Sequence, residues 1–241
     1  MILLHFGDQA PIGLSKAGKT LASLISEQGQ PVSLDNLSWA GNRWIATAIL
    51  SLDAKGYSYY LFDLTASTTT KLGDFYFQQK HGDRLVTKDA VHITAHDGMQ
   101  LNALVLRPKG VDGSVPMVVE VHGGPAHHVE WEYNHFRQFL VNRNYSVLAL
   151  NFRGSDGLGK AYQAAGFGEY GRKMQDGLVD ATNWAIDQGI ADPNSQAIMG
   201  SSYGGYAAAM ALVHDPALFR AAIIEHAMLD VVYQSQYPHH S

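Results

Sequence analysis

The chain has 241 residues, 46% of them hydrophobic, which is enough for one large domain or two smaller ones in an ordinary globular protein. Its net charge is -5, with only 17 Lys and Arg residues and no basic run, so neither nucleic acid nor an anionic membrane surface is expected as a partner. The sequence has no cysteine, which excludes disulfides, thiolate metal sites and cysteine nucleophiles.

The N-terminal stretch, MILLHFGDQAPIGLS, does not resemble a secretory signal. It contains no basic region, and Gly7 and Asp8 interrupt its apolar residues early. No apolar run elsewhere approaches the ~20 residues that a membrane-spanning helix needs. We therefore expect a soluble protein, in the cytoplasm rather than the periplasm.

Residues 1–88 have the texture of a β-structure. Strands are predicted at 44–52 and 57–64, joined by a turn at 53–56, and a second turn is predicted at 71–74 after the Ser-Thr-Thr-Thr run. Paired short strands of this kind suit a propeller blade or part of a sandwich, but they are too few to close either fold.

Residues 89–241 alternate strands with helices, which predicts a largely parallel sheet covered on both faces. A hairpin opens the pattern, with strands at 91–94 and 101–106 around a turn at 96–98. Further strands are predicted at 115–121, 147–151, 197–199 and 221–224, and helices at 133–143, 174–189 and 203–213. The fold class is therefore α/β.

The strongest chemical motif is the G-x-S-x-G pentapeptide from Gly200 to Gly204, between an apolar strand and an Ala-rich helix. A sharp strand-to-helix turn needs glycines on both sides, because the strand and the helix approach closely there. The turn exposes the Ser202 hydroxyl beside the free N–H groups of the helix N-terminus. A Gly/Ser turn that merely connects two elements is the alternative, and Ser201 lacks the symmetric glycines.

A second motif, His122-Gly123-Gly124-Pro125, follows the strand at 115–121, where a hydrolase sheet supplies its other oxyanion donor. Alone, it would more simply be a tight turn. A metal site formed by His122 with His127 and His128 is also conceivable, but their loop offers no obvious carboxylate partner. We therefore expect neither a metal nor another cofactor.

Four motifs together resemble the catalytic domain of the prolyl oligopeptidase family, especially its acylaminoacyl-peptidase and dipeptidyl-peptidase-like members. They are HGGP at 122–125, NFRGSDGLG at 151–159, GRKMQD at 171–176 and GSSYGGY at 200–206. The resemblance covers residues 89–235 and implies an α/β-hydrolase domain. Residues 1–88 are similar to the last blades of the β-propeller that precedes this domain in the family.

The resemblance implies a serine peptidase that hydrolyses short peptides through an acyl-enzyme. Ser202 would be the nucleophile, and the backbone N–H groups of Tyr203 and Gly124 would form the oxyanion hole. In some relatives a tyrosine hydroxyl serves from the place that His122 holds here, which puts a direct oxyanion role for His122 in doubt. The segment 151–159 would shape the floor of the site, with Arg153 in a structural ion pair.

This chain also departs from the family pattern at two places outside the motifs' reactive residues. Asn144-Tyr145 stands where relatives usually have Gly-Tyr, and Gly177 stands where they usually carry a second acid.

The rest of the triad is harder to find. In this fold the order is Ser, then Asp, then His, on loops after later strands, and two further strand-helix units of about 30 residues each do not fit after Ser202. Asp230 and the pair His239-His240 have the right order, but the histidines are more simply a frayed end. Asp215 lies at the far end of the helix that Ser202 begins, roughly 15–20 Å away by helix rise.

We therefore expect a fragment of a longer enzyme, with partial propeller blades at 1–88 and a hydrolase domain at 89–241 that lacks its last strands. Two alternatives stay open. A carboxylesterase uses the same nucleophile turn and oxyanion hole, and a non-catalytic fragment or pseudoenzyme would explain the missing triad residues. Without a general base, the Ser202 hydroxyl is a poor nucleophile at neutral pH.

Overall fold

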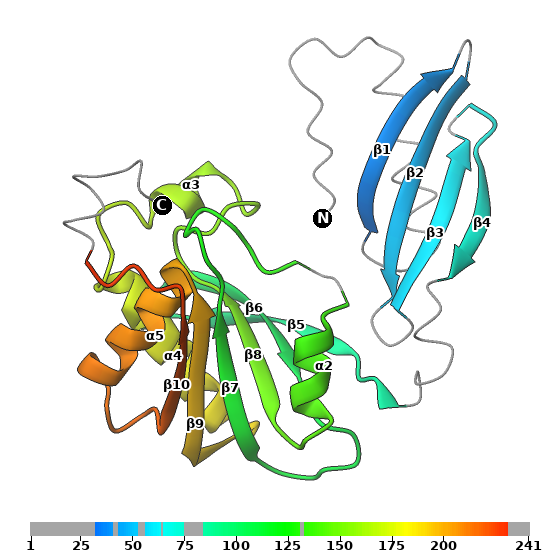
Figure 1. The fold of residues 1–241 in the computed structure, drawn as a ribbon. Helices are drawn as coiled ribbons and strands as arrows, with labels where there is room; N and C mark the ends of the chain where they lie inside the picture. The colour runs from blue at the N-terminus through cyan, green and yellow to red at the C-terminus, as the bar shows by residue number, and fades with distance from the viewer. Residues whose placement is uncertain are drawn as a thin grey trace. The chain divides into compact units, whose positions relative to one another are not determined.

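The computed structural model describes residues 32–40, 43–52, 56–63, 65–74, 84–130 and 133–230. The N-terminal stretch, most of the turn predicted at 53–56, and His239-His240 lie outside these residues. The chain divides into two compact units, Met1–Leu85 with Trp131–Asn134, and Val86–Glu130 with His135–Ser241 (Figure 1). The predicted division falls after residue 88, and its interpretation as two domains stays a prediction.

The first unit contains a four-stranded antiparallel sheet in the order β1-β2-β3-β4 (Figure 1). Its strands are β1 (Val32–Ala40), β2 (Arg43–Leu52), β3 (Gly56–Asp63) and β4 (Thr68–Asp74). The strand predicted at 44–52 is confirmed, and so is the strand predicted at 57–64 as far as Asp63, but the turn predicted at 71–74 is wrong. Lys71 pairs with Tyr60 inside β4, which begins with three β-branched threonines that favour a strand.

Strand β1 was not predicted, because Asp35 and Asn36 interrupt its alternation of apolar and polar residues. The register against β2 shifts between Leu34 and Asn36. A bulge of this kind takes up one extra residue, so that the apolar alternation resumes beyond it.

The second unit is built on a mixed sheet in the order β10-β9-β7-β8-β6-β5. Its strands are β5 (Lys88–Thr94), β6 (Gln100–Leu106), β7 (Val115–Val121), β8 (Ser146–Asn151), β9 (Ala191–Ser201) and β10 (Ala221–Glu225). The predicted hairpin is β5-β6, and β6 joins β8 antiparallel. Strands β8, β7, β9 and β10 are mutually parallel, so their C-terminal ends meet at one edge of the sheet. In such sheets ligands bind at this edge.

Helices lie on both faces of this sheet. They are α2 (His135–Val141), α3 (Lys160–Ala164), α4 (Lys173–Asp187) and α5 (Tyr203–His214). Helices α4 and α5 bury small and aliphatic side chains in the main core, against residues such as Leu148 and Leu150 of β8. Val141 of α2 packs instead with Val147, whose side chain points to the opposite face because strand residues alternate. The five-residue α3 was not predicted.

A partly buried ion pair connects α2 to the sheet. Glu120 of β7 accepts hydrogen bonds from Arg137 Nε at 2.7 Å and from Arg137 Nη2 at 3.0 Å. This two-point geometry is the strong form of a carboxylate-guanidinium contact. Helix α2 is shorter than predicted, and Arg143 lies beyond its end, with its guanidinium 3.6 Å from the centre of the Phe139 ring.

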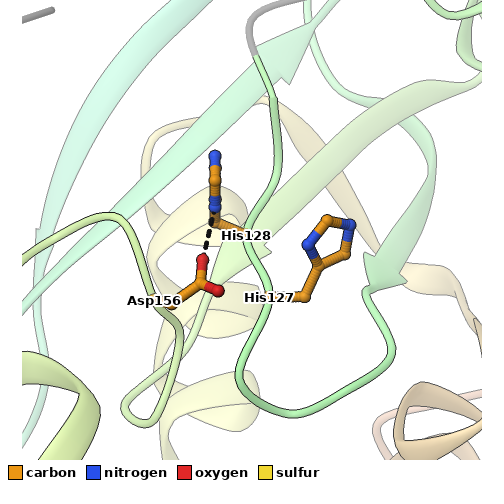
Figure 2. Close-up of side chains that lie close together, drawn as sticks. All are labelled: His127, His128 and Asp156. Carbon is orange, nitrogen blue, oxygen red and sulfur yellow. Dashed lines mark hydrogen bonds and ion pairs between the residues drawn. The ribbon is translucent and has the colours of Figure 1, made fainter. Parts of the chain in front are cut away.

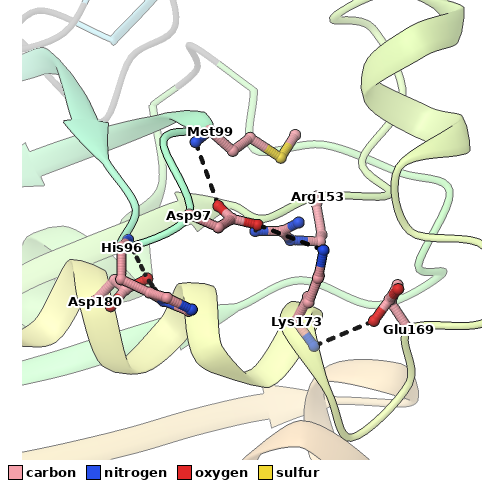
Figure 3. Close-up of polar contacts among 7 residues, drawn as sticks. All are labelled: His96, Asp97, Met99, Arg153, Glu169, Lys173 and Asp180. Carbon is pink, nitrogen blue, oxygen red and sulfur yellow. Dashed lines mark hydrogen bonds and ion pairs between the residues drawn. The ribbon is translucent and has the colours of Figure 1, made fainter.

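A polar cluster links the β5-β6 turn to α4 and to the loop after β8 (Figure 3). Asp180 Oδ2 accepts from the His96 backbone N–H at 3.0 Å and lies 2.8 Å from His96 Nδ1. Arg153 Nη2 lies 2.8 Å from Asp97 Oδ2, with Lys173 Nζ at 3.9 Å. Burial would raise the pKa of Asp97, but its contacts with Arg153 and other donors lower it. Arg153 therefore forms the expected structural ion pair.

No helix in the part of the chain that the structure describes is long and apolar enough to cross a membrane.

Candidate active site

The turn between β9 and α5 holds Ser202 in a backbone conformation that L-residues rarely adopt. Its φ is 58° and its ψ is -119°, just before α5 begins at Tyr203. Its backbone N–H donates to Glu225 O at the end of β10 (3.0 Å), and Tyr206 N–H donates to Ser202 O (3.1 Å). The surrounding backbone thus imposes the strained conformation, which is typical of functional turns.

The predicted glycines are needed because backbones touch at this turn. A Cβ on Gly200 would lie 2.4 Å from the carbonyl carbon of Gly204. A Cβ on Gly204 would lie 2.1 Å from Val121 O, at the end of β7. Both distances are far below van der Waals contact, so neither position accepts a side chain. The G-x-S-x-G pattern therefore reflects direct backbone packing between β9, α5 and β7.

The two predicted oxyanion donors belong to different elements, Tyr203 to the start of α5 and Gly124 to the loop after β7. Tyr203 is the first residue of α5, so its backbone N–H belongs to the first turn, which has no acceptor within the helix. Its ring is buried and contacts Phe152 and Tyr170, which anchors the start of the helix. On the β7 side, a Cβ on Gly123 would lie 3.4 Å from the Ser202 Cβ, so the loop that carries Gly124 passes beside the serine.

His122, at the start of this loop, contacts the backbone of the loop. Burial is the main cause that lowers the pKa of His122 to about 4, so its ring is neutral at pH 7. Its Nδ1 lies 2.8 Å from Gly123 O, which only accepts, so Nδ1 carries the proton. Its Nε2 lies 2.8 Å from Ser155 Oγ, whose single hydroxyl proton is also within reach of Phe152 O at 2.7 Å, and the ring stacks on Phe152.

This contact acts on the predicted oxyanion donor. The Gly123 carbonyl and the Gly124 N–H belong to one planar trans peptide, so they point in opposite directions. By holding the carbonyl, His122 sets the direction of the N–H. Ser155 was not anticipated from the sequence, because nothing in the loop at 151–159 indicates which residue faces His122.

The histidine-rich loop after β7 has a carboxylate partner in the structure. Asp156 Oδ1 lies 2.5 Å from His128 Nδ1, so the carboxylate that the histidine-rich loop lacks comes from the loop after β8 (Figure 2). His127 lies next to this pair, and one ligand atom from each of the three residues lies within 4.8 Å of the others. The expectation that these histidines have no carboxylate partner is wrong.

The two departures from the family pattern have local explanations. Asn144 has a φ of 63°, in the left-handed region that glycine adopts without strain and asparagine tolerates. Gly177 is buried on α4, where a Cβ would meet Leu101 Cδ1 at 3.4 Å. A second acid at this position would face the main core.

The described candidates for the remaining triad residues, Asp215 and Asp230, do not join the serine. Among the residues that the structure describes, no hydrogen bond links the Ser202 hydroxyl to a histidine. Asp215 directly follows α5, at the opposite end from Ser202, as predicted. Asp230 is exposed beyond β10.

The chain is similar to known proteins in sequence and in fold. Residues 131–240 match the prolyl oligopeptidase family. The dipeptidyl aminopeptidase BIII of Pseudoxanthomonas mexicana is 40% identical over 174 residues, which cover 68% of this chain and 25% of that protein. The chain belongs to the prolyl oligopeptidase family. The dipeptidyl peptidase family member 6 of Caenorhabditis elegans is 34% identical over 201 residues, covering 75% of this chain and 27% of that protein.

Solved structures with a similar fold support the α/β-hydrolase class. A puromycin hydrolase has a TM-score of 0.77 at 22% identity, over 85% of this chain and 32% of that one. A puromycin-hydrolyzing peptidase of Mycobacterium tuberculosis has a TM-score of 0.73 at 25% identity, over 83% and 31%. The chain spans about a quarter of the length of the two curated relatives named above.

Proposed function

We propose that this chain carries the nucleophile and the oxyanion hole of a serine peptidase that acts on short peptides. The backbone of Ser202 carries the proposal, because its strained turn lies at the C-terminal edge of the sheet between two glycines that admit no side chain. The names of the two dipeptidyl peptidases among the relatives favour a short peptide as substrate.

The reaction is acyl transfer. Ser202 Oγ attacks the peptide carbonyl carbon and loses its proton to a general base, while the N–H groups of Tyr203 and Gly124 stabilise the negative charge that develops on the carbonyl oxygen. The C–N bond then breaks, and the base returns the proton to the leaving amine. Water hydrolyses the resulting ester in the same way and restores the serine.

We further propose that the general base comes from the part of the parent protein that this chain does not span. Among the residues that the structure describes, the parallel strand β10 ends the sheet on one side, and Ile223 and Ile224 within it are 49% and 42% exposed. Additional strands there, with an Asp and a His on their loops, would complete both the sheet and the triad. The meander β1-β2-β3-β4 likewise has the strand number and order of one propeller blade, which supports partial blades at 1–88.

A fluorophosphonate probe tests the assignment of Ser202. We expect slow labelling of the folded 241-residue chain, mapped by mass spectrometry to Ser202, because the turn and the oxyanion hole are present without a base. Ser202→Ala should abolish the labelling, and the matched variant Ser201→Ala should keep it. Labelling no faster than in the urea-denatured chain would instead indicate a non-catalytic protein.

Substrate class needs a second measurement, because peptidases and esterases react alike with the probe. The full-length parent should turn over an aminoacyl anilide with Ser202 intact. Turnover of a simple ester without the anilide would favour the carboxylesterase alternative.

A further inference from the structure

Two loops meet beside the candidate active site and bring together three metal-ligating side chains. His127 and His128 follow the glycines after β7, and Asp156 lies in the loop after β8. The loops are also joined through their backbones, since Asp156 N–H donates to His127 O at 3.0 Å. Figure 2 shows both histidines on the same loop, with Asp156 reaching His128 from the other.

The backbone around these residues accommodates the close approach. A Cβ on Gly157 would lie 3.1 Å from His128 Nδ1, and its φ of +70° is one that glycine adopts freely. Because position 157 is a glycine, the His128 ring can lie against the backbone of the loop after β8. The side chains of His128 and Asp156 are each 38% exposed, so solvent and ions reach them.

We propose that His127, His128 and Asp156 form a site for one transition-metal ion, with Zn²⁺ as the best match. Two imidazoles and one carboxylate are the ligand set that zinc takes with a fourth position left to water. The two nitrogen donors disfavour Mg²⁺ and Ca²⁺, which prefer oxygen ligands. The proposal is independent of the proposed peptidase function.

The ligand atoms need only a small rearrangement. They lie within 4.8 Å of one another, whereas donors around a tetrahedral zinc are roughly 3.3–3.5 Å apart, as follows from bond lengths of about 2.0–2.2 Å. The exposed His127 side chain has room to turn towards the other two. The ion would also replace the hydrogen bond between His128 and Asp156, and because metal and protons compete for the same ligand atoms, binding weakens at acidic pH.

A bound ion would clamp the loop that carries Gly124. The ring of His127 lies edge-on to that of His122, with 6.1 Å between ring centres. Metal at the site would therefore tie the segment from His122 to His128 to the loop after β8 at a second point, beside the contact between His122 and Ser155. We expect binding to stabilise the folded chain.

The experiment is calorimetric titration of Zn²⁺ into the untagged 241-residue chain after treatment with EDTA. We expect one ion per chain, and a higher unfolding temperature with Zn²⁺ but not with Mg²⁺. Asp156→Asn and His128→Gln should each weaken binding by about tenfold or more. Asp156→Asn is the sharper variant, because its amide oxygen still accepts the hydrogen bond from His128 and preserves a purely structural role.

Two controls separate this site from other histidines. His92→Gln changes an exposed histidine on β5 and should bind Zn²⁺ like the wild type. Loss of binding in a His239→Gln/His240→Gln variant alone would overturn the proposal, and so would unchanged binding in Asp156→Asn. Should a variant not fold, titration of the wild-type chain with Co²⁺ in place of Zn²⁺ still tests the proposal. Absence of the absorption bands of four-coordinate Co²⁺ would also overturn the proposal.

Discussion

Replacing Ser202 by glycine should stabilise the fold, although it removes the proposed nucleophile. With a φ of 58° and a ψ of -119°, Ser202 occupies a region that costs an L-residue of order 1–3 kcal/mol. Glycine adopts this region without steric cost but loses about 0.5–1 kcal/mol through the greater freedom of its unfolded chain. Alanine keeps the Cβ and therefore keeps the strain.

The comparison of Ser202→Gly with Ser202→Ala isolates this strain, since both variants lack the hydroxyl. We expect the glycine variant to have a free energy of unfolding about 1–2 kcal/mol above that of the alanine variant. The hydrogen bond from the Ser202 N–H to Glu225 O is a backbone contact and is present in both. Asn144→Gly is the matched control, because asparagine already tolerates its φ of 63° and should gain less.

Urea denaturation followed by far-UV circular dichroism measures these differences, with equal m-values as the condition for comparing them. An alanine variant as stable as the glycine variant would refute the argument that the turn holds Ser202 under strain. The proposed nucleophile would then lie in a relaxed loop.

Two further predictions concern packing and pH. Gly204→Ala should lower the free energy of unfolding by about 3 kcal/mol or more, because its Cβ would lie 2.1 Å from Val121 O. Gly177→Ala in helix α4, where the Cβ would lie 3.4 Å from Leu101, should leave the free energy of unfolding unchanged or raise it by up to about 1 kcal/mol. Equal effects of the two substitutions in urea denaturation would contradict this prediction. Acidification should destabilise the metal-free chain through His122, whose pKa is about 4 when folded against 6.5 when unfolded, since the unfolded chain binds the proton first. This contribution is present above pH 6.5 and is lost as the pH falls to about 4, with roughly 2 kcal/mol lost at pH 5. The stability of His122→Gln should therefore fall less on acidification than that of the wild type.

Local patterns predicted most of the second unit. The run at 115–121 forms β7 and the hairpin at 91–106 forms β5-β6, because continuous or alternating apolar residues select strands before any tertiary contact is known. The turn at Ser202 was equally predictable, since its glycines are required by the backbone itself. Strand β1 was not predicted, because a bulge interrupts its alternation of apolar and polar residues.

Contacts between loops could not be predicted from the sequence. His128 and Asp156 are 28 residues apart, and His122 and Ser155 are 33 apart, in segments without regular periodicity. They meet because β7 and β8 are parallel neighbours whose C-terminal ends lie side by side. The order of the strands in the sheet was not deduced from local sequence patterns, so neither of these contacts could be predicted.

The backbone contact between β9, α5 and β7 at Gly200 and Gly204 has a consequence for how this fold diverges. At Gly200 and Gly204 the spacing of the three elements is set by atoms that every amino acid shares, so mutation of the surrounding core leaves it unchanged. Residues such as Leu148 or Ala207 are free to change with their neighbours while the serine keeps its place. Spacing set in this way is compatible with the likeness in fold to the puromycin hydrolase, which is only 22% identical to this chain.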